Sequence, residues 1–567
     1  MASSIFSAVT ALLFLSQAAN ASYAPTSTSC PSSSLVRPAD SLNSNEASYV
    51  SQRKQNADEA LTAWLAKVNS GFVVNGSLPT LALATSGGGY RSLLVGAGVI
   101  QGFDERDSNA STSGLYQALT YQSGLSGGAW LLSSIAGNNY PTITSLKQGL
   151  WEQAFQDSLL VPGNLLVAAS YASITSDIEA KAAAGFSPTL TDPWGRLLSY
   201  QLFYGTDGGV DITLSSVSSL SNFTDYEAPF PIMLALGVKT WQGDCTPGPN
   251  ATIYEFTPYE FGSWDSDVSA FTQTQYLGTS LSGGQPSEGS CTTNYDNIGY
   301  VLGTSSNLFN EVCIPVATTN STADTYTALA QDLSVIVSKT HEIATRDEYA
   351  AYPNPFYEYN SSSSIPNSAD PVWAQQELHL ADGGEANQND PIWPFLQPYR
   401  DVDVLIVNDN SADTSANYPN GSEILTTYVQ STNRNLTKMP YIPPVDTFIA
   451  EGLNTRPTFF GCTESDKLTI IYIPNVNMTY DSGQSTYKLE YTTDETDGMI
   501  SNGVAMAEQP DDDNWATCLG CAILAKTSST LPLDCTACFA QYCYADLNST
   551  LSSVASAVPS AVPSVSL

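Results

Sequence analysis

Residues 124–128, Gly-Leu-Ser-Gly-Gly, place one serine between glycines in the spacing G-x-S-x-G. The short run 121–123 leads into this segment, and the apolar, helix-like run 129–136 follows it. Glycines on both sides let the backbone turn sharply and leave the hydroxyl of Ser126 exposed at a helix start, where the helix dipole favours an alkoxide. The pattern predicts Ser126 as the nucleophile of a serine hydrolase. An ordinary glycine turn is the alternative, because the chain contains 39 glycines.

A second glycine-rich segment, Ser-Gly-Gly-Gly-Tyr-Arg at residues 86–91, follows the apolar run 81–85, which predicts a short strand. Three successive glycines allow backbone N–H groups to converge on one point, as an oxyanion hole requires. Arg91 could bind a phosphate through two parallel hydrogen bonds. A simple glycine turn is again the alternative. A nucleotide site is disfavoured, because neither G-x-x-x-x-G-K-[ST] nor G-x-G-x-x-G occurs here.

Asp382 is the candidate general base. It follows the strand-like run 377–381 and precedes two glycines, although an aspartate before glycine usually caps a turn. The chain has only two histidines, His341 and His379, and both precede Asp382, whereas the catalytic histidine of α/β-hydrolases follows the acid. The sequence therefore fits a Ser126–Asp382 dyad better than a triad. With an ordinary carboxyl pKa near 3.9, such a dyad is expected to work below about pH 5.

The elements that must position these residues alternate along the chain. Nearly continuous apolar runs at 230–236, 402–407 and 468–473 predict strands buried on both faces. Helix-like stretches such as 46–68 and 325–338 lie between them. This order predicts an α/β fold with a central, mostly parallel sheet flanked by helices.

The ends of the chain differ from its middle. An apolar run and an Ala-x-Ala pattern predict a signal peptide over 1–21, and a Ser/Pro/Thr-rich, loose arm follows over 22–45. No linker interrupts residues 46–546, which we interpret as one catalytic domain with a Cys-rich end at 518–543. The tail 547–567 is expected to be disordered, without the apolar stretch of a glycolipid anchor signal.

Composition excludes several classes of partner. With 19 basic and 55 acidic side chains the formal net charge is −36, which argues against nucleic acid and against anionic membranes. No stretch after the signal peptide approaches the roughly 18 apolar residues of a transmembrane helix. A secreted, extracellular protein is therefore expected, with association with the cell wall left open.

Ten cysteines and ten N-x-S/T sequons agree with export. Cys518-x-x-Cys521 and Cys535-x-x-Cys538 have the spacing of a zinc site, but an oxidising compartment favours disulfides. The sequons predict glycosylation at Asn75, Asn109, Asn222, Asn250, Asn320, Asn360, Asn420, Asn435, Asn477 and Asn548.

The three motifs at 86–91, 124–128 and 382–384, in this order, resemble the catalytic domain of the patatin-like and cytosolic-phospholipase type. Longer stretches resemble the fungal lysophospholipases, also called phospholipases B. These stretches are 191–196 (Thr-Asp-Pro-Trp-Gly-Arg), 382–394, 411–413, 457–462 and the C-terminal cysteine cluster. The resemblance covers roughly residues 30 to 545.

The resemblance implies a role for each matched residue. Ser126 would form an acyl-enzyme, and Asp382 would take the serine proton and later activate water. Gly88 and Gly89 would donate N–H groups to the oxyanion, and Arg91 would bind the substrate phosphate. No cofactor or metal is implied, because the calcium-binding domain of some cytosolic relatives has no counterpart here. The substrates would be lysophospholipids and diacyl phospholipids in membranes or micelles. The alternatives are a general carboxylesterase or acyltransferase with the same dyad, or a non-catalytic cell-wall glycoprotein.

Overall fold

The computed structural model describes residues 23–162, 167–311, 325–359, 371–462 and 464–544. The predicted signal peptide 1–21 and tail 547–567 lie outside the described residues, as do Cys313 and the sequons at Asn320, Asn360 and Asn548.

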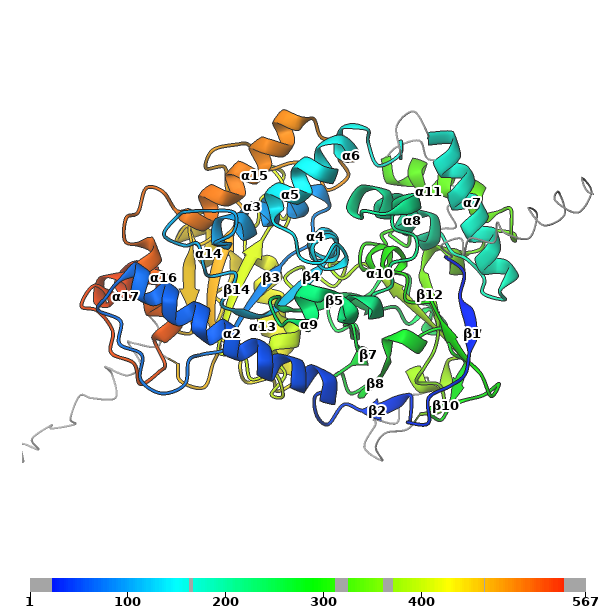
Figure 1. Ribbon diagram of the computed structural model, residues 1–567, viewed down its shortest axis with the longest axis horizontal. Helices are drawn as coiled ribbons and strands as arrows, with labels where there is room; N and C mark the ends of the chain where they lie inside the picture. The colour runs from blue at the N-terminus through cyan, green and yellow to red at the C-terminus, as the bar shows by residue number, and fades with distance from the viewer. Residues whose placement is uncertain (1–22, 163–166, 312–324, 360–370, 463, 545–567) are drawn as a thin grey trace, which may run out of the picture.

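A twelve-stranded sheet runs through the molecule (Figure 1). Its order is β15 (Thr458–Phe460), β16 (Thr469–Pro474), β14 (Val404–Asp409), β3 (Leu81–Thr85), β4 (Leu119–Leu125), β5 (Phe230–Gly237), β6 (Ile253–Phe256), β7 (Glu260–Ser263), β8 (Ala270–Gln273) and β2 (Val36–Pro38). The strand β13 (Glu377–Ala381) also pairs with β5, and β12 (Ala350–Pro353) pairs with β13.

The five strands from β16 to β5 are parallel to their neighbours, and the remaining pairings are antiparallel. The α/β class is therefore confirmed, and the parallel pairing that the sequence predicts for most of the sheet is confined to its centre. Strands β3, β14 and β16, which overlap the predicted apolar runs at 81–85, 402–407 and 468–473, are buried along their whole length, as expected of parallel strands covered on both faces. The sheet as a whole is mixed, because the short antiparallel strands β6, β7 and β8 extend it beyond β5.

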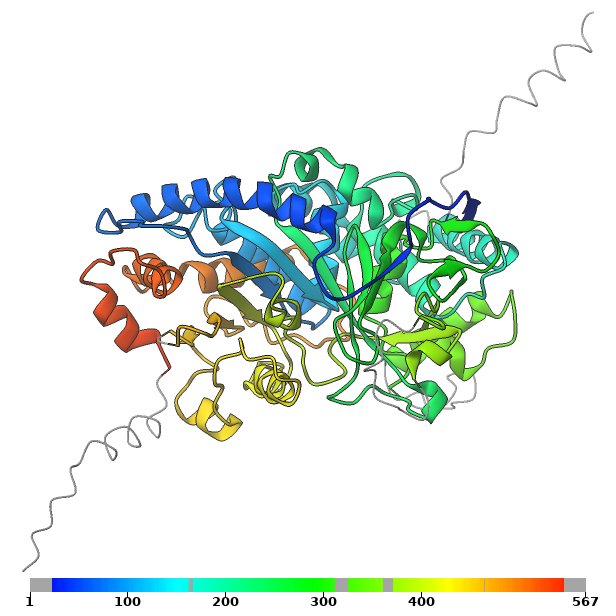
Figure 2. The ribbon, with the colours of Figure 1, turned by 90° about the horizontal axis from the view of Figure 1, so that it is seen from below.

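Helices cover both faces of the parallel centre. On one side α3 (Tyr90–Phe103) and α4 (Gly127–Gly137) pack together, with α15 (Thr493–Glu508) against α3. On the other side α2 (Ser44–Val68) packs against β4 and β5, and α16 (Trp515–Leu524) against β16. The view from below separates α2 from α13 (Ser422–Asn433), which lie on opposite sides of the molecule (Figure 2).

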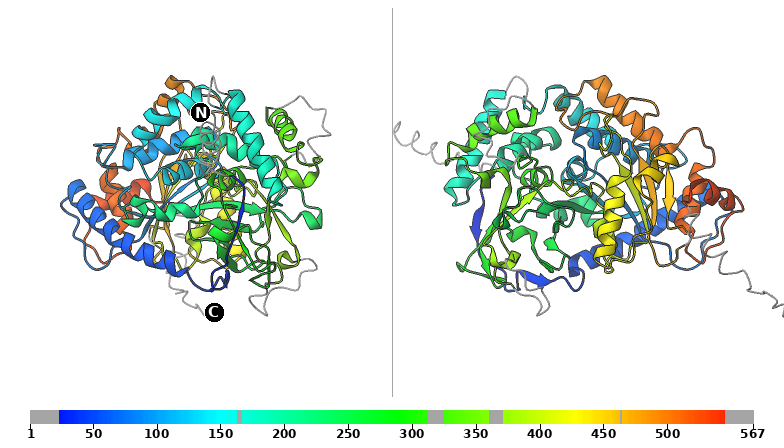
Figure 3. Two further views of the ribbon diagram at one scale, coloured as in Figure 1. Left: turned by 45° about the vertical axis from the view of Figure 1, so that its right-hand side comes forward. Right: turned by 180° about the vertical axis from the view of Figure 1, so that it is seen from behind.

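The antiparallel strands form the other half of the molecule with a second group of helices, side by side with the parallel centre (Figures 1 and 3). Its main helices are α7 (Val167–Ala183), α8 (Thr191–Leu202), α10 (Ile298–Ser305) and α11 (Thr325–Val337). The remaining helices are α5 (Ile143–Leu146), α6 (Glu152–Gln156), α9 (Ser221–Thr224), α12 (Trp393–Leu396), α14 (Val445–Ala450) and α17 (Cys535–Tyr542). Two small sheets pair β1 (Thr26–Thr28) with β11 (Cys291–Thr293) and β9 (Leu281–Ser282) with β10 (Gln285–Pro286).

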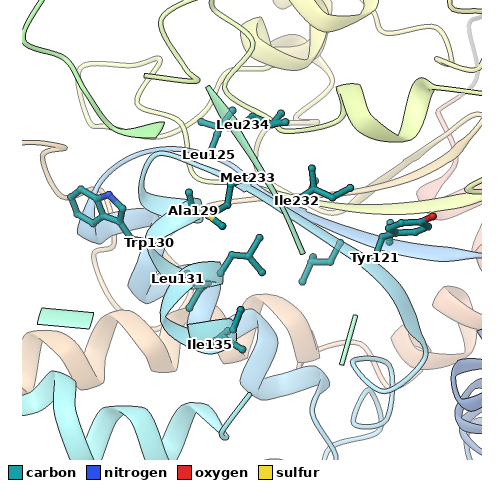
Figure 4. Packing of buried hydrophobic residues seen from close by; sticks show 14 of the residues in the cluster. Tyr121, Leu125, Ala129, Trp130, Leu131, Ile135, Ile232, Met233 and Leu234 are labelled. Carbon is teal, nitrogen blue, oxygen red and sulfur yellow. The ribbon is translucent and has the colours of Figure 1, made fainter. Parts of the chain in front are cut away.

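The hydrophobic core holds α4 rigidly on the sheet. Figure 4 shows Ala129 of this helix beside Met233 of β5, with Leu131 and Ile135 further along the same helix, and all four side chains are fully or almost fully buried. Burial of one such side chain contributes roughly 1.5–3 kcal/mol. The helix that follows Ser126 is therefore fixed in position relative to the strands on either side.

The described part of the N-terminal arm is held against the rest of the molecule. The strand β1 pairs with β11, β2 pairs with β8, and a disulfide joins Cys30 to Cys291. Serine and proline are common in mobile segments, but here the pairing of backbone groups and the disulfide outweigh composition.

The cysteines with zinc-like spacing are paired with one another. Disulfides join Cys518 to Cys538 and Cys521 to Cys535, so these four thiols form no zinc site. A further disulfide joins Cys462 to Cys543. Together they fix α16 and α17 to each other and to the end of β15. Among the described helices, none is long and apolar enough to span a membrane.

Candidate active site

The three predicted motifs meet at one cavity of about 640 Å³. The segment 86–89 leaves the end of β3, Ser126 follows β4, and Asp382 follows β13. The carboxyl ends of neighbouring strands β3 and β4 lie at the same edge of the sheet, where α/β proteins bind ligands. Gly88, Arg91, Ser126 and Asp382 all line this cavity.

Ser126 stands at a sharp turn between β4 and α4. Its φ of 49° and ψ of −123° lie in a region that non-glycine residues rarely adopt. The two positions after Ser126 require glycine, because the backbone here packs closely against the loop 86–89. A Cβ on Gly127 would overlap the carbonyl oxygen of Gly89. A Cβ on Gly128 would likewise overlap the carbonyl oxygen of Thr85. The G-x-S-x-G segment therefore packs directly against the glycine-rich loop and presents the Ser126 side chain to the cavity.

Asp382 is the hydrogen-bond partner of Ser126. A hydrogen bond from the Ser126 side chain and one from the Gly384 N–H, 2.7 Å from Oδ1, stabilise the carboxylate. Burial outweighs both and raises the pKa of Asp382 to about 7. This differs from the ordinary value near 3.9 that the sequence argument assumed. The reason is desolvation, since Asp382 is only 3% exposed.

The end of α10 holds both residues of this pair in place. The Ser305 carbonyl accepts hydrogen bonds from the N–H groups of Ser126 (3.1 Å) and Gly383 (3.2 Å), and the Ser305 hydroxyl accepts a further one from Ser126 N–H (2.9 Å). The Asp382 N–H donates to the carbonyl of Asn307 (2.9 Å). Ser305 and Asn307 could not be predicted from the sequence, because no local pattern links them to Ser126 or Asp382. Ser305, for example, is 179 residues away from Ser126 along the chain.

The loop 86–89 offers two backbone donors. Among the described residues, no hydrogen-bond acceptor is found for the N–H groups of Gly88 and Gly89, whereas Gly87 N–H donates to the Asn389 side chain (3.1 Å). Gly89 has a φ of 59° and is the N-cap residue of α3, directly before Tyr90. The starts of α3 and α4 thus both face the cavity with their positive dipole ends. The arrangement can stabilise an oxyanion beside Ser126.

Arg91 is the only basic residue among the described residues that line the cavity. Its Nε donates to the carbonyl of Asn410 (2.8 Å), and its Nη1 donates to the carbonyl of Gln484 (2.6 Å) and to Thr486 Oγ1 (3.1 Å). Its Nη2 has no partner among the described residues. Burial lowers the pKa of Arg91 to about 10, so the side chain stays charged at neutral pH. It can therefore bind an anion through Nη2 while it joins the loops at 410 and 484–486.

The cavity is also lined by carboxyl groups that sequence reasoning did not assign to the site. Burial raises the pKa of Glu385 to about 9, with the nearby Asp382 raising it further. Burial and the neighbouring Asp413 raise the pKa of Glu423 to about 8. Burial, together with Asp409, raises the pKa of Asp413 to about 6. The stretch 382–394 was recognised as typical of the family. The raised pKa values could not be predicted from it, because they arise from burial in the folded protein.

Neither histidine lines the cavity. His379 bonds through Nδ1 to Thr240 Oγ1 (2.7 Å) and through Nε2 to Glu377 (2.9 Å), and its ring stacks on Tyr349. His341 pairs with Asp347 at 3.1 Å. In these interactions both histidines contact residues outside the cavity.

Asparagines of the described sequons are accessible. Asn75, Asn109, Asn250, Asn435 and Asn477 are exposed, and Asn222 and Asn420 are half-buried.

Comparisons with known proteins identify the family. A family model described as the lysophospholipase catalytic domain matches residues 81–549. This chain belongs to that family. It is 40% identical to "Lysophospholipase 1" of Aspergillus fumigatus, over 93% of this chain and 88% of the relative. It is also 40% identical to a "Lysophospholipase" of Penicillium chrysogenum, over 93% and 91% of the two chains.

The fold is shared with a solved structure. Human GIVD cytosolic phospholipase A2 superposes with a TM-score of 0.67 at 17% identity, over 88% of this chain and 72% of that one. The predicted resemblance to this type of catalytic domain is thereby confirmed. The prediction that the chain is an enzyme, a hydrolase of the lysophospholipase family, is confirmed by the family match.

Proposed function

We propose that this protein is a secreted lysophospholipase and phospholipase B that hydrolyses fatty acyl esters of lysophospholipids and of diacyl glycerophospholipids. The single observation that carries the proposal is the Ser126–Asp382 hydrogen bond beside a cavity that Gly88 and Arg91 also line. The names of the curated fungal relatives support the choice of substrate.

In the proposed mechanism Ser126 Oγ attacks the acyl carbonyl carbon while Asp382 accepts the hydroxyl proton. The carbonyl oxygen becomes an oxyanion that the N–H groups of Gly88 and Gly89 stabilise. Collapse breaks the ester bond, and the glycerol oxygen leaves with the proton from Asp382. The acyl group stays on Ser126 as an ester. Water then attacks this ester and gives a proton to Asp382. The bond between Ser126 Oγ and the acyl carbon breaks, Asp382 returns the proton to Oγ, and the fatty acid is released.

Arg91 binds the phosphate of the headgroup in this proposal. Arg91 lines the cavity, and its Nε and Nη1 donate to backbone carbonyls, so the guanidinium is fixed before substrate arrives. Such fixed donors lose little conformational entropy on binding.

Secretion and glycosylation form the second part of the proposal. The disulfides and the accessible sequon asparagines are compatible with an oxidising, extracellular location. Glycosidase treatment of culture supernatant should then increase the gel mobility of the protein.

Replacement Ser126→Ala tests the catalytic part. The variant should fold and be exported, because Ser126 contributes to the fold through its backbone N–H, which alanine retains. Hydrolysis of lysophosphatidylcholine should fall by about 10³-fold or more, since no acyl-enzyme can form. Turnover near that of the wild type would refute the assignment of the nucleophile.

A further inference from the structure

One wall of the cavity has a charge pattern that the proposed acyl transfer does not use. Arg91 Nη1 donates to Thr486 Oγ1 at 3.1 Å. The next residue, Tyr487, lines the cavity with a side chain that is 40% exposed, and its hydroxyl donates to Glu311 Oε2 at 3.3 Å. A buried guanidinium, an aromatic ring and a carboxylate therefore follow one another along the wall.

This order complements a zwitterionic phospholipid headgroup, in which a phosphate is followed by an ammonium. Proteins commonly bind quaternary ammonium groups on the faces of aromatic rings, and a neighbouring carboxylate adds electrostatic attraction. The phosphate would meet Arg91 Nη2, which has no partner among the described residues and belongs to a side chain that is 1% exposed. The ammonium would then reach Tyr487 and Glu311.

We propose that Tyr487 and Glu311 form a subsite for the ammonium of choline and ethanolamine headgroups, which makes the enzyme prefer these lipids over those with uncharged alcohol headgroups. The proposal rests on the proposed function, since it extends the phosphate site at Arg91.

Glu311 is the carboxylate best suited to this role. Burial raises the pKa of Glu385 to about 9 and that of Glu423 to about 8, so both are largely protonated at pH 7 and carry little negative charge. Glu311 is exposed at the cavity mouth and keeps access to solvent. It lies close enough to Asp382 and Glu385 to raise the pKa of each of them.

The test compares three lysolipids with the same acyl chain and choline, ethanolamine or glycerol headgroups. Each is presented at the same low mole fraction in uncharged detergent micelles, so the charge of the interface stays constant. The wild type should show a higher kcat/KM for the choline and ethanolamine lipids than for the glycerol lipid. Glu311→Gln should reduce this ratio by roughly tenfold. Glu451→Gln, which removes an exposed carboxylate outside the cavity, should leave it unchanged.

Tyrosine variants separate the ring from its hydroxyl. Tyr487→Phe keeps the aromatic face and should retain most of the headgroup preference, whereas Tyr487→Leu should lose it. Equal losses on all three lipids in Glu311→Gln and Tyr487→Leu would overturn the proposal, because they would show a general effect on the cavity.

Direct binding distinguishes failure of the subsite from failure of the proposed function. Phosphocholine titrated into Ser126→Ala in a calorimeter should bind more tightly than glycerol 3-phosphate, and the added change Glu311→Gln should remove the difference. Equal affinities in Ser126→Ala would overturn the subsite even if lysolipids are hydrolysed. A clear preference for phosphocholine would support it even if turnover of lysolipids proved absent.

Discussion

Two sets of groups contribute to the cavity, and we refer to them as its first and second walls. The first wall consists of the backbone N–H groups and the Arg91 guanidinium at the starts of α3 and α4. The second wall consists of the carboxyl groups of Asp382, Glu385, Asp413 and Glu423, whose pKa values are raised by burial to between about 6 and about 9. The first wall keeps its charge from acid to neutral pH. The second wall changes its charge in this range. We therefore expect pH to change the activity through the second wall, whereas the first wall should respond mainly to substitutions.

Gly127→Ala should damage the first wall most strongly. The added Cβ would overlap the carbonyl oxygen of Gly89 and displace the loop that carries the oxyanion donors. Loss of one such donor costs about 10²–10³-fold in kcat, and we expect at least this loss on lysophosphatidylcholine. Circular dichroism checks the fold, and Gly248→Ala at an exposed loop serves as the control. Activity within a few-fold of the wild type would show that this loop takes no part in catalysis.

The second wall should respond to acid. Asp382 acts as a base only when ionised, and its pKa in the free enzyme is raised to about 7. The kcat/KM should therefore level off above about pH 7 and fall tenfold per pH unit below it, to roughly a hundredth at pH 5. This replaces the expectation, based on an ordinary carboxyl pKa, that the dyad keeps working below about pH 5. A pH profile of kcat/KM on an uncharged ester measures it, and an acidic limb near pH 4 would contradict the raised pKa.

Stability should change with pH in the opposite direction from activity. The folded-state pKa values of Asp382, Asp413, Glu385 and Glu423 lie above the ordinary carboxyl values, so the folded protein binds more protons than the unfolded chain. Their contribution to stability is fully present below about pH 4 and is lost as pH rises through about 6 to 9. Through these groups, Tm should be higher at pH 5 than at pH 8.

Glu423→Gln isolates one of these carboxyl groups. Glutamine resembles the protonated acid and can still accept the hydrogen bond from Asn389 N–H, which is 2.8 Å long. The variant should have a Tm a few degrees above the wild type at pH 8 and close to it at pH 5. The exposed Glu451→Gln should show no such dependence. A variant that is less stable than the wild type at pH 8 would mean that the Glu423 charge stabilises the fold.

Local sequence patterns predicted much of the fold and of the first wall. The apolar run before each motif and the glycines within it determine the strand, the turn and the helix start, so Ser126 and the loop 86–89 could be placed from neighbouring residues alone. The second wall could not be predicted in this way. The pKa of Asp382 depends on burial, and its position depends on contacts with Asn307 and the end of α10, which come from distant parts of the chain.

The antiparallel half of the sheet also could not be predicted from the sequence. Strands β6 to β8 are only four residues long, and β2 lies in an arm whose composition is typical of a mobile segment. Short runs of this kind give a weak periodic signal, and their pairing is set by hairpins and by the Cys30–Cys291 disulfide.

Covalent labelling by a fluorophosphonate tests the Ser126–Asp382 dyad most directly. The wild type, Asp382→Asn and the double variant His341→Gln/His379→Gln are incubated with an alkyl fluorophosphonate, and the modified peptide is identified by mass spectrometry. We predict stoichiometric modification at Ser126 in the wild type and at a similar rate in the histidine variant. Asp382→Asn, checked for folding by circular dichroism, should react at least 10³-fold more slowly. Modification at another residue, or a folded histidine variant that no longer reacts while Asp382→Asn still does, would contradict the dyad.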